Sequence, residues 1–284
     1  MTRLAILTPR TDGYYGRAWT AAFDRYVRAL SPQGLDLVPL DWREAATADV
    51  DAVMPLLAWG YHIDAPDWLA MLTALDASGV KTFNPAALLR WNTRKTYLND
   101  LEDADVPVVP TIFVERATAT VVEGARELLG GGELVVKPQI SGGSHETVRL
   151  APGAVLAGGP TGPAMIQPFL PSVSGEGEIS LLFFDGVFSH AIGKVAKAGD
   201  FRVQPQFGSR IGPITPTDEA LDVARTVFAA VDQPLTYARI DLIRHLDGSL
   251  RLMELEAIEP DLFLEHAPDG GAAFAAAVAR ALED

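Results

Sequence analysis

The first ninety residues alternate between short apolar runs and longer segments with helical spacing. Apolar runs bounded by turn residues predict four strands, at 4–9, 35–42, 51–60 and 80–85. Apolar positions three and four apart predict helices at 19–30 and 66–79, and Gly79 marks the end of the second helix. This strand–helix alternation predicts a small parallel sheet with helices on its faces.

In such a sheet, binding groups gather in the loops at the carboxyl ends of the strands. Two loops of this kind are expected, at 9–12 and 59–62, and both carry polar and aromatic side chains. A third polar segment follows the last predicted strand, near the end of the chain. Together these segments supply the candidates for a substrate pocket: Asp12, Tyr14, Tyr15, Trp59, Tyr61, His62 and Glu259.

Beyond residue 90 the pattern changes to hairpins mixed with helices. The spacing predicts helices at 92–104, 118–130 and 271–283, strands from Val108 and at 133–140, and a hairpin at 178–196 with Asp185-Gly186 as its turn. Antiparallel strands mixed with helices indicate an α+β fold. The chain has 284 residues, enough for several small domains. We expect three, at 1–90, 91–165 and 166–284.

A second hairpin, at 237–260, carries acidic residues on both arms. With Asp247-Gly248 as a tight turn, Asp241 lies opposite Glu254, and Arg239 lies opposite Glu256. Opposed residues share a face of the sheet, and so do residues two apart on one strand. The other face then points into a core and consists of Ile240, Leu242, Met253 and Leu255.

Asp241, Glu254 and Glu256 therefore form one acidic cluster, which needs a counter-charge. Two carboxylates ~5 Å apart repel by ~3 kcal/mol at an effective dielectric of about 20. Arg239 alone does not neutralise three anions. A divalent cation with oxygen ligands would, and Mg²⁺ is commonly held by carboxylates together with substrate phosphates. The alternative is an exposed hairpin face whose acids are solvated.

Composition and charge exclude several classes of protein. Cysteine is absent, so disulfides, a thiol nucleophile and Cys-ligated metals are excluded. The net charge of −14 disfavours binding to the phosphate backbone of DNA or RNA. The first apolar run is too short for a signal peptide, and the longest uncharged stretch, 151–175, is too rich in Gly and Pro for a membrane helix. We therefore expect a cytoplasmic protein with no membrane or nucleic-acid partner.

The segment ELVVKPQISGGSH places Lys137 at the end of a predicted strand, before a loop of small residues, Ser141, Gly142, Gly143 and Ser144. Glycines let backbone N–H groups approach an anion, and the ammonium adds positive charge. The segment is not a P-loop, because no Gly-Lys-Ser/Thr opens a following helix. An ordinary turn beside a surface lysine is the alternative interpretation.

Two later segments carry further candidate chemistry. Residues 167–170 are predicted to be an irregular linker whose free backbone groups could bind an adenine edge, and Glu176 and Glu178 could accept from ribose hydroxyls. A basic stretch follows, with Lys194, Lys197, Arg202 and Arg210. It could neutralise phosphates during phosphoryl transfer. The alternatives are an interdomain linker, a solvated acidic turn and a basic loop paired with surface acids.

Together and in this order, these segments resemble the ATP-grasp superfamily, in particular its glutathione-synthetase-like and ribosomal-modification-ligase-like branch. The resemblance covers nearly the whole chain and implies an N-terminal βαβ domain followed by two lobes that clasp ATP. Lys95, in NTRKTYLNDLEDADVPVVPT, and Lys137, in VVKP, match lysines that contact the nucleotide. The other matches are Gln167, Pro168, Phe169 and Leu170 to the adenine hinge, Glu178 to the ribose acid, Arg202, Lys194 and Arg210 to cations near the transferred phosphate, and Asp241 and Glu254 to the Mg²⁺ ligands.

Two departures from that family stand out. Glu256 occupies the position where the family usually has Asn, in the motif Glu254-Leu255-Glu256. The following run, AIEPDLFLEH, is similar to the smaller ATP-grasp group that contains the cyclo-ligase of D-cycloserine biosynthesis, which closes O-ureido-D-serine into a ring. The extra carboxylate raises the charge of the metal site but still supplies oxygen ligands.

The resemblance implies an ATP-dependent ligase that joins a small-molecule carboxylate, activated as an acyl phosphate, to an amine-type nucleophile. It implies ATP and Mg²⁺ as cofactors, with Mn²⁺ as a substitute, and leaves a homo-oligomer open. One alternative is an inactive ATP-binding sensor or partner module. Another is a Ca²⁺-binding or sugar-binding α/β protein. A dinucleotide oxidoreductase is disfavoured, because Gly13 and Gly16 do not complete the glycine fingerprint.

Overall fold

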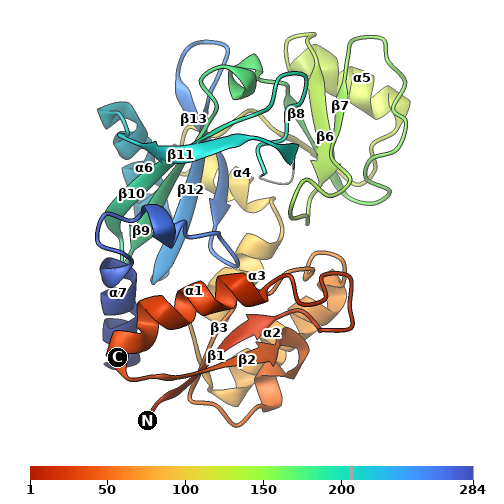
Figure 1. The fold of residues 1–284 in the computed structure, drawn as a ribbon. Helices are drawn as coiled ribbons and strands as arrows, with labels where there is room; N and C mark the ends of the chain where they lie inside the picture. Colours follow the sequence, from red (N-terminus) through yellow and green to blue (C-terminus); the bar gives the residue numbers. More distant parts are fainter. Residues whose placement is uncertain (205–206, 284) are drawn as a thin grey trace.

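The computed structural model describes residues 1–204 and 207–283, which form three β-sheets with helices packed on them (Figure 1). The N-terminal sheet has the strand order β2–β1–β3–β4, with every neighbouring pair parallel. Its elements are β1 (Arg3–Thr8), α1 (Thr20–Leu30), β2 (Asp36–Asp41), β3 (Ala52–Met54), α2 (Ala65–Ser78) and β4 (Lys81–Thr82). The predicted parallel sheet is confirmed, and Gly79 ends α2 in the left-handed conformation at φ 74°.

The predicted strand at 51–60 is shorter than expected, because β3 ends at Met54 and the chain then enters a series of turns. Leu56 and Leu57 of this turn segment are buried, so their apolarity reflects packing in a loop rather than strand structure. The turns carry Trp59, Tyr61 and His62 beyond the edge of the sheet.

The central sheet is antiparallel, with the order β5–β8–β6–β7. Its strands are β5 (Ile112–Val114), β6 (Leu134–Pro138), β7 (Val148–Leu150) and β8 (Ala164–Pro168), with α5 (Ala119–Leu128) packed on one face. The prediction that residues 167–170 form an irregular linker is wrong for Gln167 and Pro168, which pair with Val135 and Leu134 of β6. The Phe169 N–H also donates to the Glu133 carbonyl, at 2.8 Å, so only the end of this segment is irregular.

The C-terminal sheet has five antiparallel strands in the order β11–β10–β9–β12–β13. They are β9 (Glu178–Phe184), β10 (Val187–Val195), β11 (Arg210–Ile214), β12 (Tyr237–Arg244) and β13 (Leu250–Glu256), with α6 (Asp218–Ala230) against them. The hairpin between β9 and β10 is confirmed. Asp185 and Gly186 have φ values of 53° and 70°, the positive values that a tight hairpin turn requires.

The helix predicted at 92–104 is wrong as one element, because it consists of α3 (Ala86–Thr93) and α4 (Tyr97–Asp103). The chain becomes extended at Arg94, where φ is −106° and ψ is 121°. Next, the N–H of Lys95 donates to the carbonyl of Gln139 in the central part of the chain, at 2.8 Å. The break ties the two helices to the central sheet and buries the Lys95 side chain.

The acidic hairpin has the predicted register at its inner end, where Asp241 pairs with Glu254 and Arg239 with Glu256. From Leu242 outward the register shifts by one, because the tip is wider than a two-residue turn: the His245 N–H donates to the Ser249 carbonyl. Met253 is the extra residue that restores the register. The prediction that Met253 points into the core is wrong, since it is only partly buried and packs beside Ile243.

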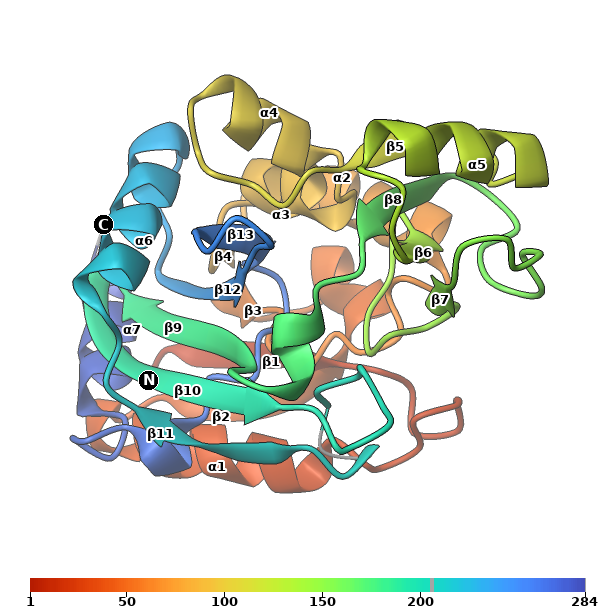
Figure 2. The same cartoon turned by 90° about the horizontal axis from the view of Figure 1, so that it is seen from above.

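The last helix, α7 (Ala272–Glu283), returns to the N-terminal part of the chain and lies beside α1 (Figure 1). Phe274 and Val278 share a core with Ile6 and Tyr26. Seen from above, the central sheet stands to one side of the C-terminal sheet (Figure 2). The three sheets follow the order of the predicted segments 1–90, 91–165 and 166–284, whose boundaries stay a prediction. Within the described residues, no helix combines the length and apolarity that a membrane crossing demands.

Candidate active site

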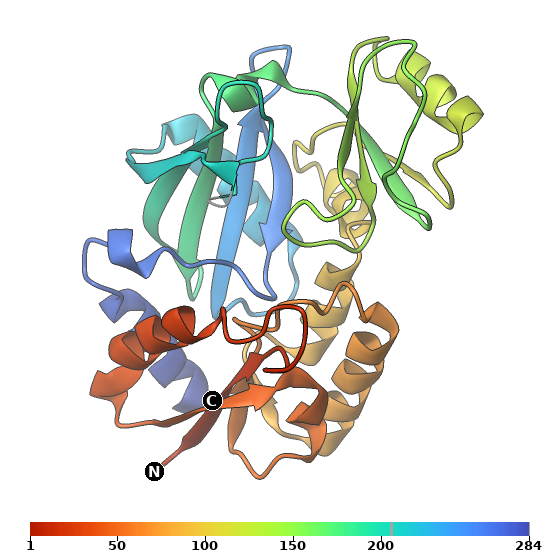
Figure 3. The same ribbon diagram turned by 45° about the vertical axis from the view of Figure 1, so that its right-hand side comes forward.

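A cavity of about 410 Å³ lies between the three sheets, whose arrangement is seen in Figure 3. Each sheet or its loops contribute to its wall. The N-terminal part supplies Trp59 and Tyr61, and the loop after β6 supplies residues 141–144. The C-terminal sheet supplies the charged side chains Glu178, Lys194, Arg239, Asp241, Glu254 and Glu256. Residues predicted from three separate segments are therefore brought together.

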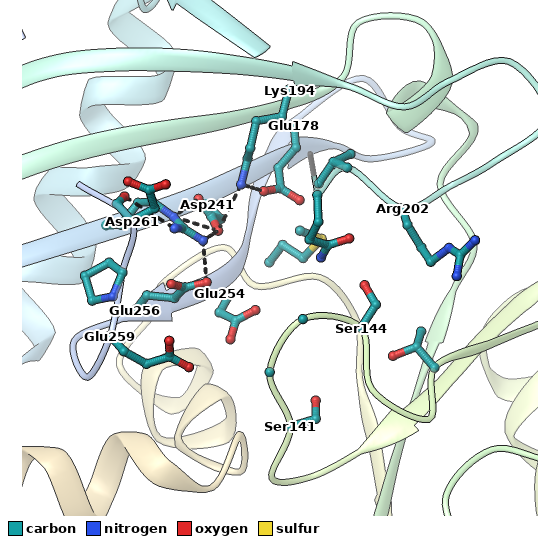
Figure 4. A pocket seen from close by; sticks show the side chains of 18 of the residues that line it. Ser141, Ser144, Glu178, Lys194, Arg202, Asp241, Glu254, Glu256, Glu259 and Asp261 are labelled. Carbon is teal, nitrogen blue, oxygen red and sulfur yellow. Dashed lines mark hydrogen bonds and ion pairs between the residues drawn. The ribbon is translucent and has the colours of Figure 1, made fainter. Parts of the chain in front are cut away.

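The acidic cluster of the hairpin is balanced by three cations rather than by one. Figure 4 shows Lys194 beside Glu178 and Asp241. Arg239 contacts Asp241 with its Nε 3.0 Å from Oδ1 and its Nη2 2.9 Å from Oδ2, and it also pairs with Glu256. Lys194, on β10, pairs with Glu178 and lies 3.4 Å from Asp241 Oδ2. Lys95 donates to Glu254 Oε1 at 2.6 Å.

These ion pairs affect the pKa values of the three acids differently. Burial raises the pKa of Asp241, but Arg239 and Lys194 outweigh it and hold the pKa below its ordinary value. For Glu254 the same competition between burial and Lys95 also leaves the pKa lowered. Glu256 differs, because burial dominates over Arg239 and raises its pKa to about 8. Asp241 and Glu254 are thus anions at neutral pH, whereas Glu256 is the acid of the three that binds a proton most readily.

The three acids do not form a preassembled metal cage. Among residues 1–204 and 207–283, no group of three His, Cys, Asp or Glu side chains lies close enough to hold a metal ion. The side chains interleave with Lys95, Lys194 and Arg239, which occupy their oxygen atoms. Their carboxylate oxygens are nevertheless the donors that Mg²⁺ prefers, and all three residues line the cavity.

The loop after β6 joins the N-terminal and C-terminal walls of the cavity. Lys137, at the end of β6, is partly buried, and this burial lowers its pKa to about 8. The Ser141 carbonyl accepts from Lys95 Nζ at 3.1 Å. A Cβ on Gly142 would lie 3.1 Å from His62 Nδ1 and 3.4 Å from Glu259 Oε1, so a glycine is needed where the three segments meet.

The other end of the cavity is apolar. Ile243 and Met253 face Phe169 and Leu170 in one hydrophobic cluster, which also contains Val173 and Val203. Gln167 lines the cavity, and its amide donates to the Thr111 hydroxyl at 2.8 Å. Glu178 stands beside this end, buried in its pair with Lys194. Burial raises the pKa of Glu178 to about 7.

The structure places some candidates outside the cavity lining. Glu176 pairs with Arg244 on the surface, with Arg244 Nε 2.7 Å from Oε2, because the chain turns at Gly177 before β9 begins. Arg210 is exposed at the start of β11. Arg202 does line the cavity, but its guanidinium is held by Asp200, with Nη2 2.8 Å from Oδ2. Among the substrate candidates, Asp12 and Tyr14 are exposed.

The cavity wall also includes ionisable residues that were not predicted as part of the site. Arg25 and Tyr26 reach the cavity from α1, and Asp261 reaches it from the segment after β13. Helical spacing marked Tyr26 as a core position but gave no sign of a cavity beside it. Arg239 was expected only as a counter-charge, although its guanidinium connects two of the acids at the cavity wall.

Comparisons with known proteins agree with this architecture. A family model described as the N-terminal domain of D-cycloserine synthetase DcsG matches residues 5–84. The cycloserine biosynthesis protein DcsG of Streptomyces lavendulae is 33% identical over 275 residues, which are 88% of this chain and 90% of that protein. The glutathione synthetase of Prochlorococcus marinus (strain MIT 9313) is 30% identical over 192 residues, 63% of this chain and 58% of that protein.

Solved structures extend the likeness to the whole chain. The crystal structure of D-cycloserine synthetase DcsG matches with a TM-score of 0.82 and 29% identity, covering 99% of each chain. D-alanine–D-alanine ligase from Bacillus anthracis matches with a TM-score of 0.71 over 100% of this chain and 97% of that one, and at 16% identity it shows the fold alone. The predicted ATP-grasp fold is confirmed. The chain belongs to the ATP-grasp ligase family of which DcsG is a member, and is an ATP-dependent ligase that forms a carbon–nitrogen bond.

Proposed function

We propose that this ligase activates the carboxylate of a small amino-acid-like substrate as an acyl phosphate and then closes a ring within the same molecule. The model substrate is O-ureido-D-serine, the compound cyclised in D-cycloserine biosynthesis. The likeness to DcsG over 88% of this chain and 90% of that protein supports the cyclo-ligase assignment. The observation that carries it is one cavity lined by six cationic side chains and six carboxylates, to which all three sheets or their loops contribute.

The cavity suggests where the nucleotide binds. The apolar end beside Phe169 and Leu170 suits the adenine ring, and Glu178 lies where it could accept from the ribose hydroxyls. Lys95 and Lys137 stand on either side of the Gly-rich loop, residues 141–144, and suit the phosphates. In this proposal the ammonium of Lys95 transfers from Glu254 to a phosphate oxygen when ATP enters.

The donor set of the acidic hairpin fits Mg²⁺, since Asp241, Glu254 and Glu256 offer carboxylate oxygens and line the cavity. When bound with ATP, the ion neutralises charge on the phosphates. Departure of the Lys95 ammonium from Glu254 would free that carboxylate as a ligand. Mn²⁺ has the same preference for oxygen donors, and we propose that it substitutes.

The chain's own cations then support the transfer. An oxygen of the substrate carboxylate attacks the γ-phosphorus, and the bond to the β-phosphate oxygen breaks to release ADP. Arg239 is fixed by Asp241 and Glu256 and presents a preorganised guanidinium to the developing charge. Lys194 holds Asp241 and Glu178 in place, and Arg202 adds positive charge at the cavity wall. Arg210 is exposed and outside the lining, so it has no assigned role in this step.

In the second step the substrate nitrogen attacks the acyl carbon. The carbon–nitrogen bond forms, the bond to the phosphate oxygen breaks, and the nitrogen loses a proton. Holding both groups of one molecule in a closed cavity makes this step intramolecular, which is worth up to ~7–11 kcal/mol of the barrier. No protein nucleophile is needed, which agrees with a chain that has no cysteine.

The test is incubation with ATP, Mg²⁺ and O-ureido-D-serine, followed by mass spectrometry and an assay of ADP. We expect one ADP for each product molecule, and a ring product that is lighter than the substrate by one water while it keeps the carbamoyl group and by a further HNCO once that group has left. A linear dimer in place of the ring would refute cyclisation but keep the ligase. Nucleotide binding without ADP release over a panel of amino acids would instead indicate the inactive sensor.

A further inference from the structure

The acids that line the cavity differ in their partners. Glu178, Asp241, Glu254 and Glu256 each form an ion pair with a lysine or arginine. Asp261 accepts a hydrogen bond from the Phe263 N–H at 3.0 Å. Glu259 is the exception: within residues 1–204 and 207–283, no cation and no hydrogen-bond donor contacts its carboxylate. A largely buried carboxylate without a partner is costly, so this one is suited to a ligand.

Glu259 lies at the junction of all three parts of the site. It follows β13, and its carboxylate points toward the cavity and the loop that carries Ser141 (Figure 4). Its Oε1 and the Nδ1 of His62 both approach Gly142, at 3.4 and 3.1 Å from the position of an added Cβ. His62 Nδ1 is buried and finds no hydrogen-bond partner in the described part of the chain. His62 does not line the cavity, so Glu259 is the polar side chain that faces the cavity at this junction.

Aromatic side chains surround this point on the N-terminal side. Tyr61 is 6% exposed and lines the cavity, and the described residues offer its hydroxyl no hydrogen-bond partner. Tyr15 packs over Gly60, with its ring centroid 6.0 Å from that of Trp59. Burial, and after it the charge of Glu259, raises the pKa of both Tyr15 and Tyr61. The Glu259 carboxylate thus faces tyrosines rather than cations.

We propose that Glu259 binds the α-ammonium group of the amino-acid substrate, with the Tyr61 hydroxyl as a neighbouring acceptor. This inference rests on the proposed function and names the group that selects its substrate. An ammonium carries three N–H donors and one positive charge, which suit the two oxygens of a carboxylate and one further acceptor. Burial and the neighbouring His145 lower the pKa of His62 to about 4, so its ring is neutral and adds no positive charge beside Glu259.

Other ligands fit this position less well. A phosphate would be repelled by the carboxylate, which places the triphosphate on the side of Lys95 and Lys137. A divalent ion needs several oxygen ligands, and the described residues bring no three metal-binding side chains together. An ammonium is also stabilised by nearby aromatic faces, which Trp59 and Tyr61 provide on the cavity wall.

The experiment compares two substrates that differ only in the amino group: O-ureido-D-serine and its desamino analogue, 3-(ureidooxy)propanoate. Both retain the carboxylate and the nitrogen nucleophile. We expect the wild-type protein to prefer the amino compound by about 10- to 100-fold in kcat/KM, the range of one charged hydrogen bond. In Glu259→Gln this preference should fall close to one, through a higher KM for the amino compound and unchanged kinetics for the desamino compound.

The matched control is Glu265→Gln, which makes the same change six residues further on. Glu265 is 47% exposed and contacts Arg25 at 3.9 Å on the surface, so the preference should stay at the wild-type value. ADP should bind equally well, in the presence of Mg²⁺, to the wild-type protein and to both variants. Equal binding would show that the nucleotide-binding part of the cavity is intact. A loss of kcat of equal size on both compounds in Glu259→Gln would overturn the proposal, as would an unchanged preference.

Different experimental results would refute the proposed function and this inference. If the wild-type protein released ADP with neither compound, cyclisation would be refuted, and calorimetric titration of the two compounds would decide the inference. Tighter binding of the amino compound that disappears in Glu259→Gln would support an ammonium site. Equal binding of both compounds by the wild-type protein would overturn it.

Discussion

The two acidic regions of the cavity balance their charge in opposite ways. On the hairpin, Asp241, Glu254 and Glu256 each have a lysine or arginine within contact. Glu259 lies three residues beyond β13, and no lysine or arginine of the described chain forms an ion pair with it. Internal cations stabilise the hairpin acids in the folded protein. Burial raises the pKa of the unpaired Glu259 to about 8, so we expect this acid to ionise when a cationic group of the ligand binds beside it. The presence or absence of a charged partner thus distinguishes the acids that we propose as Mg²⁺ ligands from the acid that we propose as the selector of the substrate.

Arg239→Met should have the largest effect on stability, because it removes the cation shared by Asp241 and Glu256. Removing one partner of a buried ion pair typically costs about 3–5 kcal/mol, since the remaining charge stays buried. The free energy of unfolding, measured by urea denaturation, should fall by that amount. Arg244→Met, at the surface pair with Glu176, is the control and should cost less than about 1 kcal/mol. Equal losses would show that burial does not distinguish the two pairs.

Glu254→Gln should leave the fold intact but nearly abolish substrate-dependent ADP release. The amide still accepts a hydrogen bond from Lys95, but it has no charge for a metal ion. We expect kcat to fall by about 10²–10³-fold, the usual loss for a group that stabilises transition-state charge. Turnover near the wild-type rate would remove Glu254 from the mechanism. Glu259→Gln should instead act on KM, so this pair of variants tests the division between the two regions.

Much of this arrangement could be predicted from the sequence, and the errors have identifiable causes. The pairing of Asp241 with Glu254 was predicted on the assumption of a two-residue turn. The pairing is correct although the turn is wider, because the bulge at Met253 shifts the register back by one residue. Strand pairing followed from apolar runs and turn residues, which are local signals. The break at Arg94 was not predicted, because it depends on a tertiary hydrogen bond from Lys95 to Gln139.

The partners of the charged side chains could not be predicted from the sequence. Lys95 and Glu254 are 159 positions apart, and only the packing of α3 and α4 on the C-terminal sheet brings them together. The same holds for His62, Gly142 and Glu259, which come from three different parts of the chain. Loop position identified His62 and Glu259 as candidates, but not that both lack a partner within the described residues.

Gly142→Ala tests the junction that connects the two regions. The new methyl group would lie 3.1 Å from His62 Nδ1 and 3.4 Å from Glu259 Oε1, so the loop has to move away from one wall. We expect kcat/KM for the amino substrate to fall by about tenfold, equivalent to about 1.4 kcal/mol. Gly132→Ala is the control, because no atom lies within 4 Å of its added Cβ. Equal activity of both variants would show that the loop is free to adjust.

The smallest expected effect is a pH dependence of stability that Glu259 contributes. Burial raises its pKa from 4.5 to about 8, so the folded protein binds more protons than the unfolded chain between these values. This contribution to stability is fully present below pH 4.5 and is lost as the pH rises toward 8. Glu259→Gln removes the titration, so its stability relative to the wild-type protein should increase steadily between pH 5 and 8.5. Urea denaturation of both proteins at the two pH values measures this difference, in which the other titrating groups cancel. A constant difference would mean that Glu259 is as well solvated in the folded protein as in the unfolded chain, and the contrast with the paired acids of the hairpin would disappear.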